Sequence, residues 1–162
     1  MIEFNKFMKQ GAAIKRSFSG AIASQLNYYL KEVLKEEDLD RIVINIGTNN
    51  LTKKRQSEQE IANEIFQVVE KCHDHGINEI FVSGITCRPR YQNKIDNINK
   101  LLKDNTREYN YSFIDNSDIQ EKHLWKDKLH LNEQGMINLA CIFLDALNHH
   151  SLDNNYCYNS FY

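Results

Sequence analysis

Asp127 and His130 are the two residues of this chain whose types and spacing best suit acid–base chemistry. A carboxylate three residues before a histidine can accept a hydrogen bond from one imidazole nitrogen, which fixes the tautomer and stabilises the protonated ring. A histidine held in this way is a good general base near neutral pH. A surface pair beside a helix start, with Asn132 as the N-cap, explains the same spacing and is favoured when spacing alone is considered.

Two glycine-containing segments upstream have residues that can bind a developing negative charge. Gly47-Thr48-Asn49 follows an apolar run, and the Asn49 amide can donate to an oxyanion, a contact worth roughly 3–4 kcal/mol in a transition state. Gly20 follows Arg16-Ser17-Phe18-Ser19, and its backbone N–H can be a second donor. Each segment alone is better explained as a turn, and nothing in the sequence marks Ser17 or Ser19 as a nucleophile.

Strand-like and helix-like segments alternate along the chain, and together they must position these residues. Short apolar runs predict parallel strands at residues 13–18, 41–46, 78–83 and 111–115. Apolar residues at helical spacing predict helices over residues 22–34, 57–72, 91–102 and 132–147. Ser57 and Glu60 form a capping box, and Gly76 ends the second of these helices. The alternation predicts a three-layer α/β/α sandwich with a parallel, flavodoxin-like sheet and with its active residues in loops at the carboxyl ends of the strands.

The composition of the chain indicates which classes of protein it can belong to. The chain has 162 residues, of which 41% are hydrophobic and 26% charged, which predicts one globular domain over residues 1–148 followed by a polar, mobile tail over 149–162. The net charge of −2 indicates no nucleic-acid partner. The sequence has neither an apolar run of the ~20 residues that span a bilayer nor a signal peptide. We therefore predict a cytoplasmic protein without a membrane span.

Metal binding has little support. The four cysteines are widely spaced and fit no zinc pattern. His73 and His75 form a His-x-His pair, but they lie at a helix end, where histidines suit the helix dipole, and no further ligands are evident. We expect no metal site. Arg88-Pro89-Arg90 is a small basic loop that can contact an acidic substrate and is far too short for nucleic-acid binding.

Taken together and in order, these segments resemble the SGNH (GDSL-type) hydrolase superfamily. Residues 16–21 look like the family's second block, residues 44–51 like its third block, and residues 127–132 with Gly135 like its fifth block. The resemblance implies that Asp127 and His130 are the catalytic pair and that Gly20 and Asn49 form the oxyanion hole. It also implies the SGNH hydrolase fold, a small acyl ester as substrate, and no metal or organic cofactor. Residues 82–90 are similar to the loop after the next strand.

The sequence departs from the family pattern in two ways. Asn50 stands where the family usually has an aspartate, and the chain contains no Gly-Asp-Ser, the block that carries the nucleophilic serine. Met1 to Phe4 look like the point just after that serine, so we expect the first strand to be missing and find no nucleophile in the chain. Because the family's sheet order is 2-1-3-4-5, the missing strand would be central. An open gap there favours self-association.

Three hypotheses follow. The leading one is an SGNH-type esterase domain of the Ser-His-Asp class that lacks its first strand and serine, and that has little or no turnover as written. The alternative is a non-catalytic binding or interaction module on the same fold. The third is an unrelated flavodoxin-like domain in which the motif matches are accidental.

Overall fold

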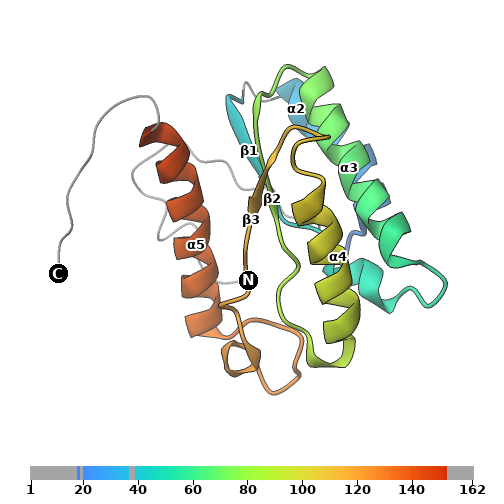
Figure 1. The fold of residues 1–162 in the computed structure, drawn as a ribbon, viewed down its shortest axis with the longest axis vertical. Coiled ribbons are helices and arrows are strands. Elements are labelled where there is room, and N and C mark those ends of the chain that lie inside the picture. The colour runs from blue at the N-terminus through green and yellow to red at the C-terminus, as the bar shows by residue number, and fades with distance from the viewer. Residues whose placement is uncertain (1–17, 19, 37–38, 153–162) are drawn as a thin grey trace.

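The computed structural model describes Phe18, residues 20–36 and residues 39–152, and the strand predicted at residues 13–18 lies outside this part of the chain except for Phe18. The described residues alternate between helices and strands (Figure 1). In chain order the elements are α2 (Ala23–Glu36), β1 (Arg41–Ile44), η1 (Thr48–Thr52), α3 (Glu58–Asp74), β2 (Glu79–Ser83), η2 (Pro89–Tyr91), α4 (Gln92–Asp104), β3 (Ser112–Ile114), η3 (Glu121–His123) and α5 (Glu133–Leu152).

The described strands form one parallel sheet in the order β1-β2-β3. Val43 pairs with Phe81, which in turn pairs with Ser112. This confirms the predicted parallel α/β fold. β1 ends at Ile44, two residues before the predicted end at residue 46, because the chain leaves the sheet to enter the turn at Gly47, whose φ of 111° lies in the left-handed region.

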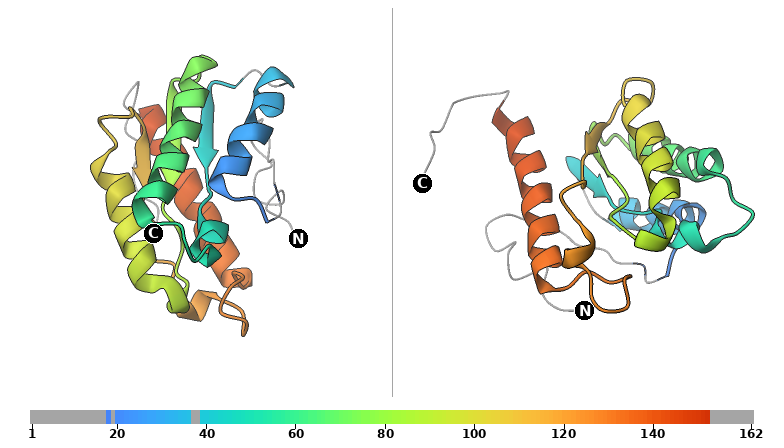
Figure 2. Two further views of the ribbon diagram at one scale, coloured as in Figure 1. Left: turned by 90° about the vertical axis from the view of Figure 1, so that its right-hand side faces the viewer. Right: turned by 60° about the horizontal axis from the view of Figure 1, so that its bottom comes forward.

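Helices cover both faces of the sheet, as the three-layer arrangement requires. α2, α3 and α4 lie on one side and α5 lies on the other (Figures 1 and 2). α3 packs against both α2 and α4. The core is formed by fully buried apolar side chains of α3, α4 and β2, among them Ile61, Ile65, Ile80, Val82 and Ile98. Burial of each such side chain contributes about 1.5–3 kcal/mol.

The helix ends follow local sequence signals. Ser57 accepts from the Glu60 backbone N–H at 3.2 Å and its own N–H donates to Glu60 Oε2 at 2.7 Å, so the predicted capping box is confirmed. Gly76, with φ 84°, follows the end of α3. α5 runs to Leu152, beyond the predicted end at residue 147 and into the predicted tail, because residues 148–152 contain no glycine or proline to stop it. Residues 153–162 lie outside the described residues.

Candidate functional site

The Asp127–His130 pair lies in a tight loop between β3 and α5. Leu124 and Leu131 form an antiparallel bridge across the base of the loop. The Trp125 backbone N–H donates to the His130 carbonyl at 2.7 Å, and the Lys128 N–H donates to the Trp125 carbonyl at 2.9 Å. We call residues 124–131 the dyad loop. Its backbone hydrogen bonds return the chain on itself within a few residues and so bring position 127 beside position 130.

Within the dyad loop, the two predicted catalytic side chains are in direct contact. Asp127 Oδ2 lies 2.7 Å from His130 Nδ1. The other carboxylate oxygen, Oδ1, accepts from the backbone N–H groups of Leu129 at 2.9 Å and His130 at 3.0 Å. The His130 side chain is 71% exposed, and no described residue forms a hydrogen bond with its Nε2 atom. An ionised Asp127 accepts a hydrogen bond from the Nδ1–H group of His130, which leaves Nε2 as the basic nitrogen.

The surroundings of Asp127 favour its charged form. The hydrogen bond from the His130 side chain, followed by the backbone N–H groups of His130 and Leu129, lowers the pKa of the Asp127 carboxyl to about 2. These hydrogen bonds go to the carboxylate and not to the protonated acid, so they stabilise the anion. Asp127 therefore stays ionised over the pH range in which a histidine acts as a base.

The dyad loop is fastened to the start of α5 by Asn132 and Gly135. Asn132 Nδ2 donates to the carbonyls of Lys122 at 2.9 Å and of Leu124, the first residue of the loop, at 3.3 Å. Asn132 Oδ1 accepts from the Gly135 N–H at 2.9 Å, as an N-cap does. A Cβ atom at Gly135 would lie 2.3 Å from the carbonyl oxygen of His123. Position 135 therefore needs glycine because the α5 backbone lies against the chain that enters the loop.

The two predicted oxyanion donors are also brought together. Gly20 has φ 74° and lies exposed just before α2. Asn49, in η1, donates from Nδ2 to the carbonyl of Ala21 at 2.9 Å. One hydrogen bond therefore connects the Asn49 amide to the residue that follows Gly20. The second Nδ2 proton of Asn49 has no acceptor among the described residues.

The loops that carry the two pairs leave the sheet at the same end. β1 and β3 both run downward in Figure 1, η1 and the dyad loop lie below their carboxyl ends, and α2 starts at that end in the left view of Figure 2. Among the described residues, no hydrogen bond joins the Gly20–Asn49 pair to the Asp127–His130 pair. A serine hydroxyl bonded to Nε2 of His130, which a serine hydrolase needs, is likewise not found in the part of the chain that the structure describes.

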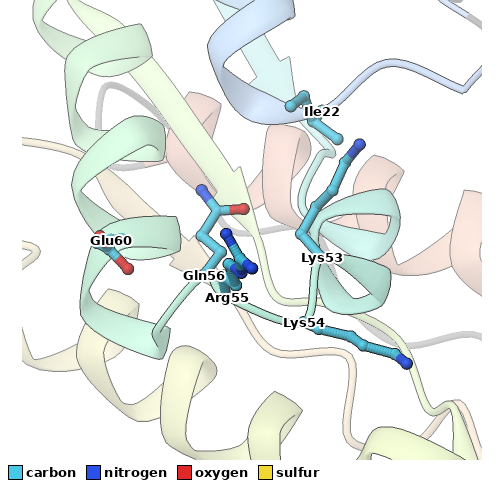
Figure 3. A pocket seen from close by; sticks show the side chains of 6 residues that line it. All are labelled: Ile22, Lys53, Lys54, Arg55, Gln56 and Glu60. Carbon is cyan, nitrogen blue, oxygen red and sulfur yellow. The ribbon is translucent and has the colours of Figure 1, made fainter.

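A hollow of about 560 Å³ is lined by Ile22, Glu60 and the segment from Lys53 to Gln56. Figure 3 shows it between the start of α2, the end of η1 and the start of α3, with Lys53 extended toward Ile22 and Lys54 directed away. Lys53, Lys54 and Arg55 on its rim are exposed and form no ion pair with another described residue. The hollow is open and basic at its edge, and Gly20 and Asn49 are not among the residues that line it.

The remaining sequence candidates have structural partners. His73 contacts carbonyl oxygens through both ring nitrogens, those of Ile77 and Tyr109 at 3.1 Å and that of Asn110 at 3.0 Å. His, Cys, Asp and Glu side chains of the described residues nowhere gather in a group of three that could hold a metal ion. Arg88 donates to the Thr48 carbonyl at 3.1 Å and so ties the loop after β2 to η1.

Sequence reasoning did not predict that two polar residues near the site are buried. Asn50 is completely buried and bonded through both ends of its amide. His123 is buried under α5 and accepts from the Gln120 N–H at 3.0 Å. Only the position of Asn50 in the third block pointed to it, and no local signal marks His123.

A family model for the GDSL-like lipase/acylhydrolase family matches residues 5–136, which is most of the chain. The chain belongs to the GDSL-like lipase/acylhydrolase family. The match includes Gly20, Asn49, Asp127 and His130, so all four predicted site residues fall inside the family region. No curated protein sequence matches the chain.

Solved structures of esterases have the fold of this GDSL-like chain. A mutant acetyl esterase with bound acetate ion is 14% identical, with a TM-score of 0.74, over 85% of this chain and 71% of that chain. A carbohydrate esterase family 3 protein from Talaromyces cellulolyticus is 14% identical, with a TM-score of 0.74, over 89% and 78%. A psychrotrophic esterase from Pseudoalteromonas sp., inhibited by monoethylphosphonate, is 16% identical, with a TM-score of 0.70, over 84% and 76%. At these identities the likeness shows the fold. No described helix is long and apolar enough to cross a membrane.

Proposed function

We propose that the chain carries the acid–base pair and the oxyanion donors of an acyl-ester hydrolase that acts on small acyl esters. The observation that carries the proposal is the 2.7 Å contact between Asp127 Oδ2 and His130 Nδ1, which directs the second ring nitrogen of an exposed histidine outward. Membership of the GDSL-like lipase/acylhydrolase family supports it.

The proposed reaction is acyl transfer to a serine followed by hydrolysis. The serine hydroxyl attacks the ester carbonyl while His130 Nε2 takes its proton, and Asp127 stabilises the resulting imidazolium. The Gly20 N–H and the free Asn49 Nδ2 proton hold the oxyanion, each contact worth roughly 3–4 kcal/mol in the transition state. His130 then returns the proton to the leaving alkoxide, and water releases the acid by the same steps in reverse. The mechanism needs no metal or organic cofactor.

The chain has no Gly-Asp-Ser sequence to supply that nucleophile. Ser83, a buried serine near the carboxyl end of β2, is committed to the Gly84 carbonyl and to Asn116. We therefore predict that the purified chain hydrolyses p-nitrophenyl acetate at close to the buffer rate, and that the rate is the same in His130→Ala. Robust turnover that is lost in His130→Ala would overturn this prediction, because the chain would then hold its own nucleophile.

A second arm tests the proposed roles directly. A protein extended at its N-terminus by an apolar strand ending in Gly-Asp-Ser should hydrolyse the same ester, and His130→Ala in the extended protein should lower kcat by about 10²–10⁴-fold, the usual contribution of a general base. His75→Ala is the matched control, since His75 is an exposed histidine whose Nδ1 contacts the Lys71 carbonyl at 2.9 Å. An extended, folded protein without activity would contradict the proposal.

The second candidate function is a non-catalytic binding or interaction module on the same fold. Two observations favour it, the absence of Gly-Asp-Ser and the presence of Asn50 where the family usually has an aspartate. A binding module should take up a non-hydrolysable ester analogue, seen as shifts of the His130 ring resonances, while the extended protein remains inactive. Turnover in the extended protein excludes this candidate.

A further inference from the structure

Asn50 is the position at which this chain departs from the family's third block, and its side chain is completely buried. Its Oδ1 accepts from the Ala23 N–H at 3.0 Å. Its Nδ2 donates to Gln56 Oε1 and to Glu64 Oε2, both at 3.0 Å. The amide thus accepts at one end and donates twice at the other, and a carboxylate cannot do this because it has no N–H.

Glu64 completes the arrangement from α3. The same carboxylate oxygen that accepts from Asn50 also accepts from the Ser24 N–H at 3.2 Å. The first N–H groups of a helix have no partner within the helix, and here those of Ala23 and Ser24, at the start of α2, bind side chains from η1 and α3. The negative charge of Glu64 also suits the positive end of the α2 dipole.

These contacts surround the segment that directly follows Gly20. Ala21 is held through its carbonyl by Asn49, Ala23 by Asn50 and Ser24 by Glu64. We propose that Asn50 and Glu64 are positioning residues that hold the Gly20 N–H and the Asn49 amide in a fixed position relative to each other. We call the two residues the Asn50–Glu64 clamp. The inference rests on the proposed function only where it takes Gly20 and Asn49 as oxyanion donors.

Charge explains why position 50 is an amide when residue 64 is a glutamate. With aspartate at position 50, a fully buried carboxylate would face the half-buried carboxylate of Glu64 at about hydrogen-bond distance, and such a pair of like charges disfavours ionisation of both groups. The other ionisable groups nearby are bound to other partners or exposed to solvent. Lys94 donates to the Gln56 carbonyl at 2.6 Å, Glu60 is bound to Ser57, and Lys53 to Arg55 are exposed. Asn50 and Glu64 thus form a matched pair.

The test compares Asn50→Asp with the double variant Asn50→Asp/Glu64→Gln, without any substrate. Two amide signals are followed by NMR, the Gly20 backbone N–H and the Asn49 side-chain NH₂. In Asn50→Asp we expect the Gly20 signal to shift and Asn49 amide exchange to accelerate about tenfold, as for the loss of one ordinary hydrogen bond. Both changes should be larger at pH 8 than at pH 5, because a proton shared between the carboxyls restores a donor.

The double variant should return both signals to their wild-type behaviour at both pH values. In it the aspartate can accept from the Ala23 N–H and from the amide that Glu64→Gln introduces, while the oxygen of that introduced amide accepts from the Ser24 N–H. Asn63→Asp is the matched control, since Asn63 is an exposed asparagine on the same helix that accepts from Gln59 at 2.9 Å. We expect no change at Gly20 or Asn49 in this control.

The outcomes separate the clamp from the proposed function. Unchanged Gly20 and Asn49 signals in Asn50→Asp at pH 8, or no recovery in the double variant, would overturn the clamp whatever the esterase assays show. If Asn50→Asp does not fold at pH 8, recovery of folding in the double variant supports the clamp, and an unfolded double variant overturns it. An intact clamp in a protein that never hydrolyses esters would count against the proposed function alone.

Discussion

At the scale of single residues, the Asp127 carboxylate accepts three hydrogen bonds, and all three stabilise its ionised form. One oxygen takes the His130 ring N–H and the other takes two backbone N–H groups of the dyad loop. The side chain is 48% exposed, so hydrogen bonds and not desolvation set its chemistry. The ionised state of the pair follows from local geometry.

The first prediction concerns the titration of Asp127. Its carboxyl pKa of about 2 in the folded protein lies below the value of about 3.9 for an unfolded chain. The hydrogen bonds to the carboxylate therefore stabilise the fold above about pH 3.9, and this contribution is lost as the pH falls through about 2. In His130→Ala the pKa should rise toward, without reaching, the unfolded value, because the backbone donors remain.

NMR titration of the Asp127 carboxyl carbon measures this pKa, with His75→Ala as the control that should leave it unchanged. A carboxyl that titrates near its unfolded value in the wild-type protein would contradict the geometry of the dyad loop.

Residue spacing predicted contacts between residues close in the sequence, but it did not predict contacts between residues far apart in the sequence. Asp127 with His130 and Ser57 with Glu60 are three residues apart, so one turn of chain brings each pair together and the sequence was sufficient to find them. Asn50 and Glu64 are 14 residues apart. Their contact depends on how α3 packs against α2 and η1, which no pattern in a single sequence states.

At the scale of elements, the start of α5 packs closely against the chain that enters the dyad loop. The helix begins against the His123 carbonyl, and a Cβ at position 135 would have to occupy that space. Glycine normally weakens a helix by about 1 kcal/mol relative to alanine. Here close packing outweighs helix propensity.

The second prediction follows from this contact. Gly135→Ala should destabilise the protein by about 1–3 kcal/mol, the usual cost of overpacking, although alanine is the better helix former. Urea unfolding measures the difference. Gln134→Ala, one residue earlier and exposed, should change the stability by no more than about 0.5 kcal/mol. A Gly135→Ala variant at least as stable as the wild type would show that η3 yields easily to the added methyl group.

Element types were predictable, while some boundaries were not. The apolar runs at residues 41–46 and 78–83 predicted β1 and β2 because a buried parallel strand reads as continuous hydrophobic sequence. α5 continued beyond residue 147 because nothing there stops a helix. The burial of His123 could not be predicted, since it depends on where α5 lies relative to η3.

At the scale of the whole molecule, the packed core and the dyad loop are different regions. β2 pairs with a strand on each side, and its residues from Ile80 to Ser83 are buried. The dyad loop lies at one end of this sheet, and most of its side chains are exposed. The fold therefore places His130 on a small, solvated loop at one end of a packed core.

The third prediction tests that separation by hydrogen exchange. Amides of β2 should exchange only through global unfolding, whereas those of Asp127 to His130 should exchange through local opening and so at least about tenfold faster. Mass spectrometry of overlapping peptides measures both segments in one experiment, with α3 as an internal reference for the core. Equal protection of the dyad loop and β2 would mean that the loop opens only when the whole domain unfolds.

Trp125 is the only tryptophan of the chain, it is 56% exposed, and its backbone N–H donates to the His130 carbonyl. The tryptophan fluorescence of this protein therefore reports on the dyad loop and carries little signal from the core. Far-UV circular dichroism, by contrast, is dominated by the four helices α2, α3, α4 and α5. Melting followed by the two signals reports two different parts of the molecule, and a compound that touches His130 changes the emission without any dye.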